Sequence, residues 1–374
     1  MSEYPFAYPR IPKQNYYVES WYPILSDLTF KTWIYHFTPE EGNLLHRVGL
    51  NIYKNNPIGK SDQESIDQFI SKVSDFFNEN MKKESPPNSG YFLRLGSRSL
   101  KDGTFGSQSA LKRINGLLYQ RYLKEYKSLK LETKKDKISW VNQKNEMNDL
   151  LNIIECDNKA LKCYTISDMF ELFFNSERVL TDLFNESKYE SPKFSLNFRL
   201  WDNRLTYQME FRGFVYHHKF CALTQYDNRI YFNQVYENKE KILLAITDFY
   251  ENKVRPRIES NCPSLEGTYV IDFGVIFNDD HVEEVLVIEL NNFLMSTGAS
   301  MFNWIRDVDI LTGRKDFEFR VVEKNQYDNI NYEDCCDPQI TFLKNQIKAK
   351  IVNDNKSFME KHFTWRADVV PNKV

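Results

Sequence analysis

Two acidic residues and one amide stand in neighbouring strand-like runs of YVIDFGVIFNDDHVEEVLVIELNNF, residues 269–293. The polar segment NDDH separates the runs, and each run carries a carboxylate, Asp272 or Glu289, among valine, isoleucine and phenylalanine. Burying an unpaired carboxylate costs free energy. A buried carboxylate is therefore expected to be stabilised by a cation or by hydrogen bonds, or to be kept for a chemical function. These two acids are therefore the first candidates for chemistry.

The spacing brings the two acids and the amide together if the runs form a hairpin. With a turn centred between Asp280 and His281, Asp272 lies directly opposite Glu289. Side chains alternate between the two faces of a strand, so Asn291 shares the face of Glu289. Such an all-oxygen set suits Mg²⁺, which completes its shell with water and substrate phosphates. The alternative is a hairpin whose acids point to solvent, and the spacing leaves both interpretations open.

A second group of candidates is basic. In YFLRLGSRSLKDG a predicted strand carries Arg94, and the loop after it carries Arg98 and Lys101 among glycine and serine. Phosphate binding requires fixed cations, small residues and backbone donors, which a strand and loop of this kind provide. A charged turn whose arginine extends to solvent accounts for the same pattern.

Two further strands add to the candidates. In MEFRGFVY, Glu210 and Arg212 share one face of a predicted strand, either as a structural ion pair or as part of a phosphate site. In FRLW, Arg199 and Trp201 have the side chains to flank an adenine ring, and the alternative is a core tryptophan. The candidate nucleotide-binding residues are Arg94, Arg98, Lys101, Arg199, Trp201, Glu210 and Arg212, and the candidate metal ligands are Asp272, Glu289 and Asn291.

Helices and strands in mixed order have to position these residues. Helical periodicity is present in SIDQFISKVSDFFNENMKK, SALKRINGLLYQRYL, TISDMFELFFNSERVLTDLF, KEKILLAITDFYENKV and DPQITFLKNQIKAKIVNDNKSFMEKHF. Strands are predicted in YFLRL, FSLNFRLW, LTYQMEFRGFVY and KFCALTQYD, and strand, turn and strand in ESWYPILSDLTFKTWIYHFTPEEGNLL. Runs of consecutive strands favour an α+β fold over strict alternation around a parallel sheet.

Composition restricts the class of protein. A chain of 374 residues exceeds one typical domain, and 28 Phe and 22 Tyr indicate a compact soluble protein rather than a disordered one. The net charge of -3 argues against bulk attraction to nucleic acid or to a membrane, so small molecules and proteins are the expected partners. Six cysteines without metal-ligand spacing, and no signal-like or long apolar segment, predict a cytoplasmic location.

Together these motifs resemble the cell division cycle protein 123 family along nearly the whole chain. SWYPILSDLTFKTWIYHFTPEE is similar to the family's N-terminal signature, and YFLRLGSRSLKDG to its phosphate strand and loop. MEFRGFVYHHKFCALTQYD resembles the Glu-Phe-Arg strand and the segment after it. YVIDFGV and VLVIELNNF resemble the two metal-carrying strands, and STGASMFNWIRD and FEFRVVE the closing motifs.

The resemblance implies an ATP-grasp-like fold whose two lobes hold ATP and Mg²⁺ between antiparallel sheets. The expected N-terminal lobe, residues 1–190, carries the phosphate-binding strand and loop and a lysine-rich insertion near residues 124–148. The expected C-terminal lobe, residues 191–374, carries the metal site and a helical tail. By this resemblance Mg²⁺ is expected on Asp272, Glu289 and Asn291, and the phosphates on Arg94 and Lys101 with Arg212 beside them.

The chain departs from the family pattern at the candidate site. Arg94 stands where the family has lysine, so a planar fork replaces a point donor. The family's Asp-Phe-Asn-Pro is ELNN here, which keeps the ligand types at Glu289 and Asn291 but lengthens one of them and loses the proline. Leu100 replaces a proline and Tyr226 replaces an arginine. These departures affect the expected geometry of phosphates and metal.

Two functions remain open at this point. The resemblance implies an ATP-binding chaperone that assists the assembly of eukaryotic translation initiation factor 2 through its gamma subunit. The alternative is an ATP-grasp ligase, or a phosphoryl or nucleotidyl transferase, that acts on a small-molecule or protein acceptor. Such an enzyme would use the same site to position Mg²⁺ and neutralise the triphosphate. No separate nucleophile or general base is recognisable in the sequence, so whether the chain is an enzyme stays open.

Overall fold

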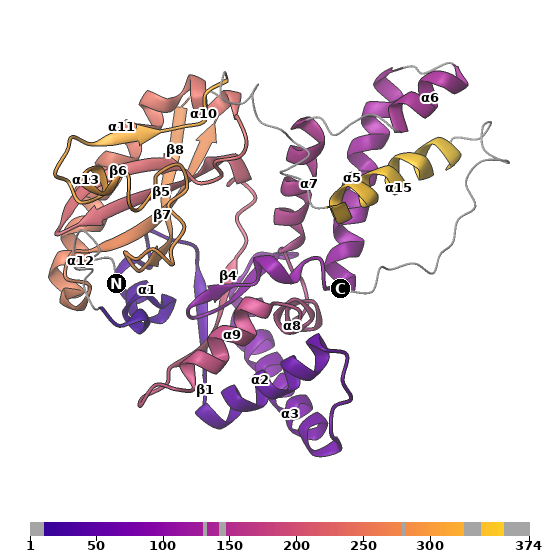
Figure 1. Cartoon of the computed structure of the whole chain (residues 1–374). Helices are drawn as coiled ribbons and strands as arrows, with labels where there is room; N and C mark the ends of the chain where they lie inside the picture. Colours follow the sequence, from indigo (N-terminus) through magenta and orange to yellow (C-terminus); the bar gives the residue numbers. More distant parts are fainter. Residues whose placement is uncertain (1–10, 130–132, 142–146, 279–280, 325–337, 355–374) are drawn as a thin grey trace. The chain divides into compact units, whose positions relative to one another are not determined.

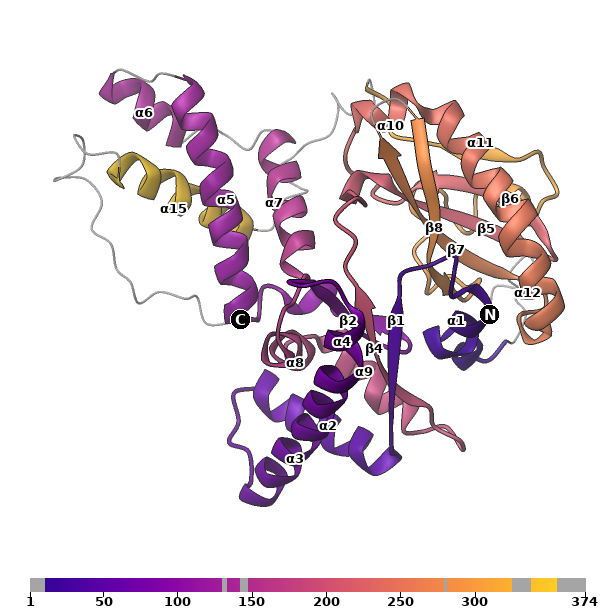
Figure 2. The same cartoon turned by 180° about the vertical axis from the view of Figure 1, so that it is seen from behind.

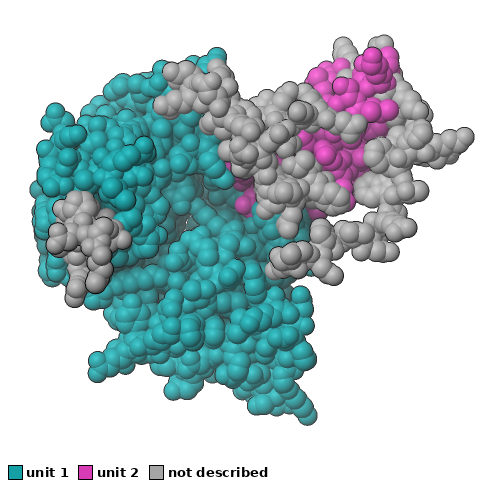
Figure 3. Space-filling model, viewed as in Figure 1, with its two compact units in different colours: residues 1–111, 158–330 teal, residues 112–157, 331–374 magenta. Residues whose placement is uncertain are grey.

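The computed structural model describes residues 11–129, 133–141, 147–278, 281–324 and 338–354. The chain divides into two compact units, coloured separately in Figure 3. Unit 1 contains residues 1–111 and 158–330, and unit 2 contains residues 112–157 and 331–374. In these described ranges, no helix has both the length and the apolar character needed to span a bilayer.

The first sheet of unit 1 is antiparallel and has the strand order β1-β4-β2-β3. Its strands are β1 (Thr32–Phe37), β2 (Tyr91–Leu95), β3 (Arg98–Ser99) and β4 (Phe194–Leu200). Because side chains alternate along each strand, the paired residues Leu93 and Phe198 share one face, and Phe92, Arg94 and Arg199 share the other. The first face packs on helices, as Phe76 against Phe198 illustrates. The second face carries the charged residues.

Helices of unit 1 form a layer beside the first sheet and a cover on the second. In Figures 1 and 2, α2, α3, α8 and α9 are grouped together, and α2 contacts each of the other three. The helices are α1 (Val18–Leu25), α2 (Pro39–Tyr53), α3 (Lys60–Phe76), α4 (Lys82–Glu84), α8 (Ile166–Phe174), α9 (Glu177–Glu186), α10 (Asn233–Glu237), α11 (Lys239–Phe249), α12 (Arg255–Asn261) and α13 (Val308–Leu311).

The first strand predicted in ESWYPILSDLTFKTWIYHFTPEEGNLL is wrong, because Val18–Leu25 forms the helix α1. Val18, Trp21 and Leu25 are spaced three and four residues apart and are all buried, which is the pattern of a helix face. In so short a segment, the alternating aromatic residues fit a strand equally well. The strand predicted after the turn is present as β1.

Local capping explains where the next helix begins. The Oγ1 of Thr38 accepts a hydrogen bond from the Glu41 backbone N–H, and the Glu41 carboxylate accepts one from the Thr38 backbone N–H. This capping box, with Pro39 at the first helical position, satisfies backbone donors that the helix itself leaves unpaired. The proline and the acidic pair that follows it thus start α2.

The second sheet of unit 1 has the order β8-β7-β5-β6-β9. Its strands are β5 (Glu210–Tyr216), β6 (Lys219–Gln225), β7 (Tyr269–Asn278), β8 (His281–Asn291) and β9 (Glu318–Arg320), and only β6 and β9 pair in parallel. Helix α11 contacts β7 and β8 on the face seen in Figure 2, where Phe273 packs on Phe249. The opposite face carries Phe214 in a buried cluster with Trp304 and α13. Mixed helices and largely antiparallel sheets confirm the predicted α+β class.

The hairpin of β7 and β8 contains two bulges that the sequence did not reveal. Near the turn, Asn278 pairs with His281, so the predicted turn centre between Asp280 and His281 is wrong. Register shifts beside Ile276 and beside Asp272 each add one residue to β8. Together they bring Asp272 opposite Glu289, which is the predicted pairing.

Backbone and side-chain contacts join the two sheets of unit 1 at β8. The Val287 N–H donates to the Leu28 carbonyl at 2.8 Å, and Thr29 Oγ1 donates to the Val287 carbonyl at 2.6 Å. Residues 28 and 29 lead directly into β1, so this junction holds the charged face of the first sheet against β8. The strand β4, which follows residue 190, belongs to the first sheet, and the predicted two-lobe division stays a prediction.

Unit 2 is helical in its described part. It is built from α5 (Gln108–Leu129), α6 (Lys134–Val141), α7 (Met147–Ala160) and α15 (Pro338–Asp354), of which α5 and α7 begin or end in unit 1. Lys344 and Lys348 are both buried and both form ion pairs with Asp149, at 3.1 and 3.5 Å. Of the lysine-rich insertion, residues 130–132 and 142–146 lie outside the described residues, and Trp140 is buried.

Candidate functional site

The three predicted metal ligands converge on one face of the second sheet. Asn291 Nδ2 lies 3.3 Å from an oxygen of Asp272 and 3.3 Å from an oxygen of Glu289. Asp272 is buried, and 19% of the Glu289 side chain is exposed to solvent. The extra residue that the bulge inserts beside Asp272 is Ile288, whose backbone therefore has no partner position on β7. The predicted meeting of two carboxylates and one amide is present.

Each carboxylate already has its own arginine. Arg212, directly opposite Asp272 on β5, forms two hydrogen bonds with it, Nε to Oδ1 and Nη2 to Oδ2, both 2.7 Å long. Arg94 of β2 places Nη1 2.7 Å from Glu289 Oε2. The first pair lies within one sheet, whereas the second joins the two sheets of unit 1.

These surroundings move the pKa values of the two acids in opposite directions. Burial raises the pKa of Asp272, and although Arg212 opposes this, the neighbouring Glu289 carboxylate adds to the increase. Burial also acts to raise the pKa of Glu289, but Arg94, Lys101 and Arg212 outweigh it and hold that pKa well below its usual range. Of the two carboxylates, Glu289 therefore stays ionised to lower pH.

Lys101 lies beside the same cluster. Its Nζ is 3.6 Å from Glu210 Oε2 and 5.0 Å from the centroid of the Tyr226 ring, while the Arg212 guanidinium lies 4.8 Å from the same ring. Burial lowers the pKa of Lys101, but Glu210, Tyr226 and Glu289 raise it more, so the ammonium group stays charged. The sequence marked Tyr226 only as a departure from the family pattern, and in the structure its ring makes cation–π contacts with both Lys101 and Arg212.

The loop that carries Lys101 is held from behind by the junction of α8 and α9. Asp102 accepts hydrogen bonds from Ser176 Oγ at 2.6 Å and from the Arg178 backbone N–H at 3.0 Å. A Cβ on Gly103 would lie 2.3 Å from the Leu172 carbonyl oxygen, so glycine is required for this close approach. The predicted small-residue loop thus has a specific packing role.

Arg199 lies where the charged cluster meets an apolar pocket. Its Nη1 donates to the Ile288 carbonyl and its Nη2 to Thr29 Oγ1, each at 2.5 Å, and its Nε is buried without a hydrogen-bond partner in the described part of the chain. Burial and the neighbouring Arg94 lower the pKa of Arg199 to about 9. Two adjacent guanidinium groups and an unpaired donor indicate a place for an anion.

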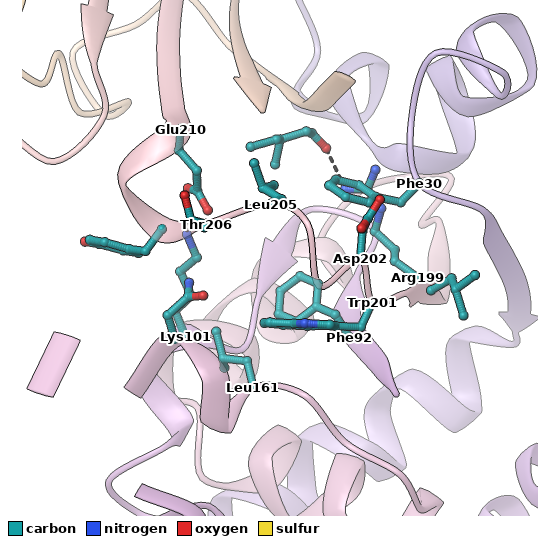
Figure 4. Close-up of a pocket in the computed structure, with 14 residues that line it drawn as sticks. Phe30, Phe92, Lys101, Leu161, Arg199, Trp201, Asp202, Leu205, Thr206 and Glu210 are labelled. Carbon is teal, nitrogen blue, oxygen red and sulfur yellow. Dashed lines mark hydrogen bonds and ion pairs between the residues drawn. The ribbon is translucent and has the colours of Figure 1, made fainter. Parts of the chain in front are cut away.

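The pocket next to Arg199 is predominantly apolar and has a cavity volume of about 90 Å³. Figure 4 shows Lys101 and Glu210 on one side and Phe30 and Arg199 on the other, with Trp201 along the floor. The pocket is lined by Phe30, Phe92, Lys101, Asn158, Leu161, Arg199, Leu200, Trp201, Asp202, Leu205, Thr206, Tyr207, Glu210 and Ile288. The sequence reasoning missed its apolar walls, which come from segments far apart in the chain.

Arg98 is the one predicted nucleotide-binding residue that lies apart from this site. It donates from Nε to Asp182 Oδ2 at 3.1 Å, and the same carboxylate accepts from Ser97 Oγ and from Lys13 Nζ. Arg98 therefore joins β3 to α9. Of the other candidates, Arg94, Arg212 and the three predicted metal ligands form the charged cluster, whereas Lys101, Arg199, Trp201 and Glu210 line the pocket.

The chemistry of the site fits a divalent cation bound together with an anion. Four cationic side chains, Arg94, Lys101, Arg199 and Arg212, lie close to the carboxylates of Glu210, Asp272 and Glu289, and the buried Glu19 carboxylate also acts on Arg94. In the described ranges, no three His, Cys, Asp or Glu side chains form a metal-binding group. A cation here would depend on the two carboxylates, on Asn291 with its amide turned over, and on ligand phosphates and water.

Three comparisons relate the chain to known proteins. The D123 family model matches residues 152–356. A "Translation initiation factor eIF2 assembly protein" of Candida albicans is 27% identical over 181 residues, which are 45% of this chain and 49% of that protein. The protein of the same name in Xenopus laevis is 31% identical over 154 residues, 39% of this chain and 42% of that protein. The matched segments thus span about half of these relatives or less.

Structural similarity extends further than sequence similarity. The structure of Cdc123 from Schizosaccharomyces pombe matches with a TM-score of 0.53 and 16% sequence identity, and the match covers 85% of this chain and 100% of that one. A C-terminally truncated form of the same protein gives a TM-score of 0.52. At this level of identity the similarity concerns the fold, which is ATP-grasp-like.

Proposed function

The chain belongs to the D123 (Cdc123) family, and from this premise we propose that it binds ATP with Mg²⁺ at the site described above and takes part in the assembly of eIF2. The observation that carries the first part is the meeting of three oxygen-bearing side chains with Arg94 and Arg212, next to Lys101 and Arg199, which line an apolar pocket. An apolar pocket with a few convergent polar groups is the usual form of a small-molecule site.

Each group has a distinct role in this proposal. Asp272, Glu289 and Asn291 hold the cation, which when bound neutralises phosphate charge. Arg94 and Lys101 stabilise the phosphates, and their positions on β2 and on the loop braced by Asp102 keep that charge fixed. Trp201 and the apolar walls take the base, since an aromatic face and an apolar pocket suit a planar heterocycle.

The second part of the proposal concerns the partner. The names of the relatives from Candida albicans and Xenopus laevis state that those proteins assemble eIF2. We infer the same role for this chain, with the gamma subunit as the direct partner. ATP bound between the two sheets of unit 1 would fix their spacing, because Arg94 and Lys101 come from one side of the site and Asp272 and Glu289 from the other.

Calorimetric titration with ATP, with and without MgCl₂, tests the site. We expect Mg²⁺ to increase the ATP affinity of the parent protein, and we expect Glu289→Gln and Asp272→Asn to remove this increase, a loss of about tenfold or more. Arg98→Met is the control, because Arg98 was a candidate nucleotide-binding residue but pairs with Asp182 outside the site. If both carboxylate variants retain their folded circular-dichroism spectrum and the full effect of Mg²⁺, the assignment is wrong.

A binding assay with purified eIF2 gamma subunit tests the partner. We expect the subunit to bind the parent protein more tightly when ATP and MgCl₂ are present, without stoichiometric release of ADP or AMP. Absence of binding under both conditions contradicts the assembly role. Nucleotide turnover that depends on an added acceptor would instead identify a ligase or transferase.

A further inference from the structure

The two ion pairs at the site differ in how firmly the arginine is held. Arg212 has three donors engaged: two on Asp272, and Nη1 on the Gly298 carbonyl at 2.5 Å. Among the residues that the structure describes, Arg94 has one short contact, Nη1 with Glu289 at 2.7 Å, and one long contact of 3.5 Å from Nε to the carbonyl of Leu95. A bidentate pair is geometrically fixed, whereas a pair that rests on one contact exchanges its partner more readily.

Glu289 is also the carboxylate on which several cations converge. Lys101 and Arg212 act on it in addition to Arg94, which is itself next to Arg199. A divalent cation that takes Glu289 removes the anionic partner of Arg94. Arg94 is buried on β2, and the buried Glu19 carboxylate acts on it without forming an ion pair. The charge of Arg94 is then only partly compensated unless another anion arrives.

We propose that Arg94 is an exchange residue, which pairs with Glu289 in the metal-free protein and with the phosphates of the nucleotide when a divalent cation occupies Glu289. This inference rests on the proposed binding of ATP and Mg²⁺. Its consequence is that the two ligands bind cooperatively. The metal alone has to displace a buried guanidinium that finds no new anion, and the triphosphate alone has to compete with Glu289 for Arg94. When both ligands bind, the metal becomes the partner of Glu289 and the triphosphate becomes the partner of Arg94. Each ligand therefore increases the affinity for the other by the same factor.

Substitution of Arg94 should change metal affinity and nucleotide affinity in opposite directions. Arg94→Met keeps an unbranched chain but removes the charge, so Glu289 becomes available to a cation. In calorimetric titration with MnCl₂ alone, we expect this variant to bind Mn²⁺ about tenfold more tightly than the parent protein. With ATP and MnCl₂ together, we expect its nucleotide affinity to fall by about tenfold. A residue with only a structural role would not improve metal binding while impairing nucleotide binding.

Two further variants locate the origin of the gain in Mn²⁺ affinity. Arg98→Met removes the arginine of the neighbouring strand β3, which pairs with Asp182, so it should change neither titration. Combining Arg94→Met with Glu289→Gln should abolish the gain, which would place its origin at Glu289. If Arg94→Met does not fold, Arg94→Lys supplies the same readout with a smaller gain, because a point charge replaces the planar fork.

The outcomes separate this inference from the proposed function. If the parent protein binds no ATP in the presence of metal, the proposed function fails. If the parent protein binds ATP with metal but Arg94→Met leaves Mn²⁺ affinity unchanged or lower, the site stands and the exchange is refuted.

Discussion

Arg94 and Arg98 follow each other closely in the chain but serve different parts of the protein. Arg94 points from β2 toward Glu289 on β8, and Arg98 points from β3 toward Asp182 on α9. Neither the residue type nor the local spacing distinguishes the two, because both stand close to glycine and serine. The distinction comes from the carboxylate that each side chain meets, and both carboxylates lie in other parts of the sequence.

Trp201 permits a test of the base subsite that leaves the phosphate subsite intact. We expect Trp201→Ala to lower ATP affinity by about tenfold or more, because stacking on an aromatic side chain is worth about 1–3 kcal/mol per base. Affinity for magnesium tripolyphosphate, which has no base, should stay close to the parent value. Competition calorimetry with the two ligands measures both. An equal loss for tripolyphosphate would show that Trp201 supports the pocket instead of contacting the base.

The elements around the site are held by ion pairs that are independent of it. The hairpin strand β3 is joined to α9 by Asp182, which accepts hydrogen bonds from Lys13, Ser97 and Arg98. Burial acts to raise the pKa of Asp182, but Lys13 and Arg98 outweigh burial, so the pKa lies below its usual range. This pairing therefore supports the fold more strongly when the carboxylate is ionised.

The pH dependence of stability follows from the direction of that shift. A carboxyl group with a lowered folded-state pKa stabilises the fold above its unfolded pKa of about 4, and the contribution is lost as the pH falls through the folded-state pKa. We expect Asp182→Asn to lower the free energy of unfolding by about 1–3 kcal/mol at pH 7. The difference from the parent protein should shrink below pH ~4.

Urea denaturation at several pH values measures this dependence, and ATP affinity at pH 7 serves as the control. Asp182 and its partner Arg98 lie outside the candidate site, so the affinity should not change. A difference in stability that is constant from pH 7 down to pH ~3 would show that the charge of Asp182 is not what stabilises the junction.

Unit 2 carries no candidate nucleotide-binding or metal-binding residue, so its stability can be changed separately. Asp149 contacts both Lys344 and Lys348, which are buried. Removing one side of a buried ion pair costs about 3–5 kcal/mol, so we expect Asp149→Ala to destabilise unit 2 by about that amount. Hydrogen exchange at the backbone amides of α5, α7 and α15 should become faster.

The same variant should retain the ATP affinity of the parent protein, because every proposed ligand-binding residue belongs to unit 1. A loss of ATP affinity alongside unchanged hydrogen exchange in unit 2 would contradict the separation of the two units in function.

The alternation and spacing of residues were sufficient to predict most elements and the core of the site. The α+β class, the hairpin of β7 and β8, and the meeting of Asp272, Glu289 and Asn291 all follow from the periodicity of strands. The predicted turn centre was wrong, yet the acids still meet, because each of two bulges adds one residue to β8 and so restores the pairing of Asp272 with Glu289. Such bulges leave no clear mark in a pattern of alternating side chains.

Contacts between distant segments were beyond the reach of the sequence. The pairing of Arg94 with Glu289, the bidentate pairing of Arg212 with Asp272, the apolar walls of the pocket and the place of Arg98 all join strands or helices that are far apart in the chain. Periodicity determines which face a side chain occupies, whereas the packing of one element on another decides what that face meets. For this reason the candidates could be predicted from the sequence, and their partners required the folded structure.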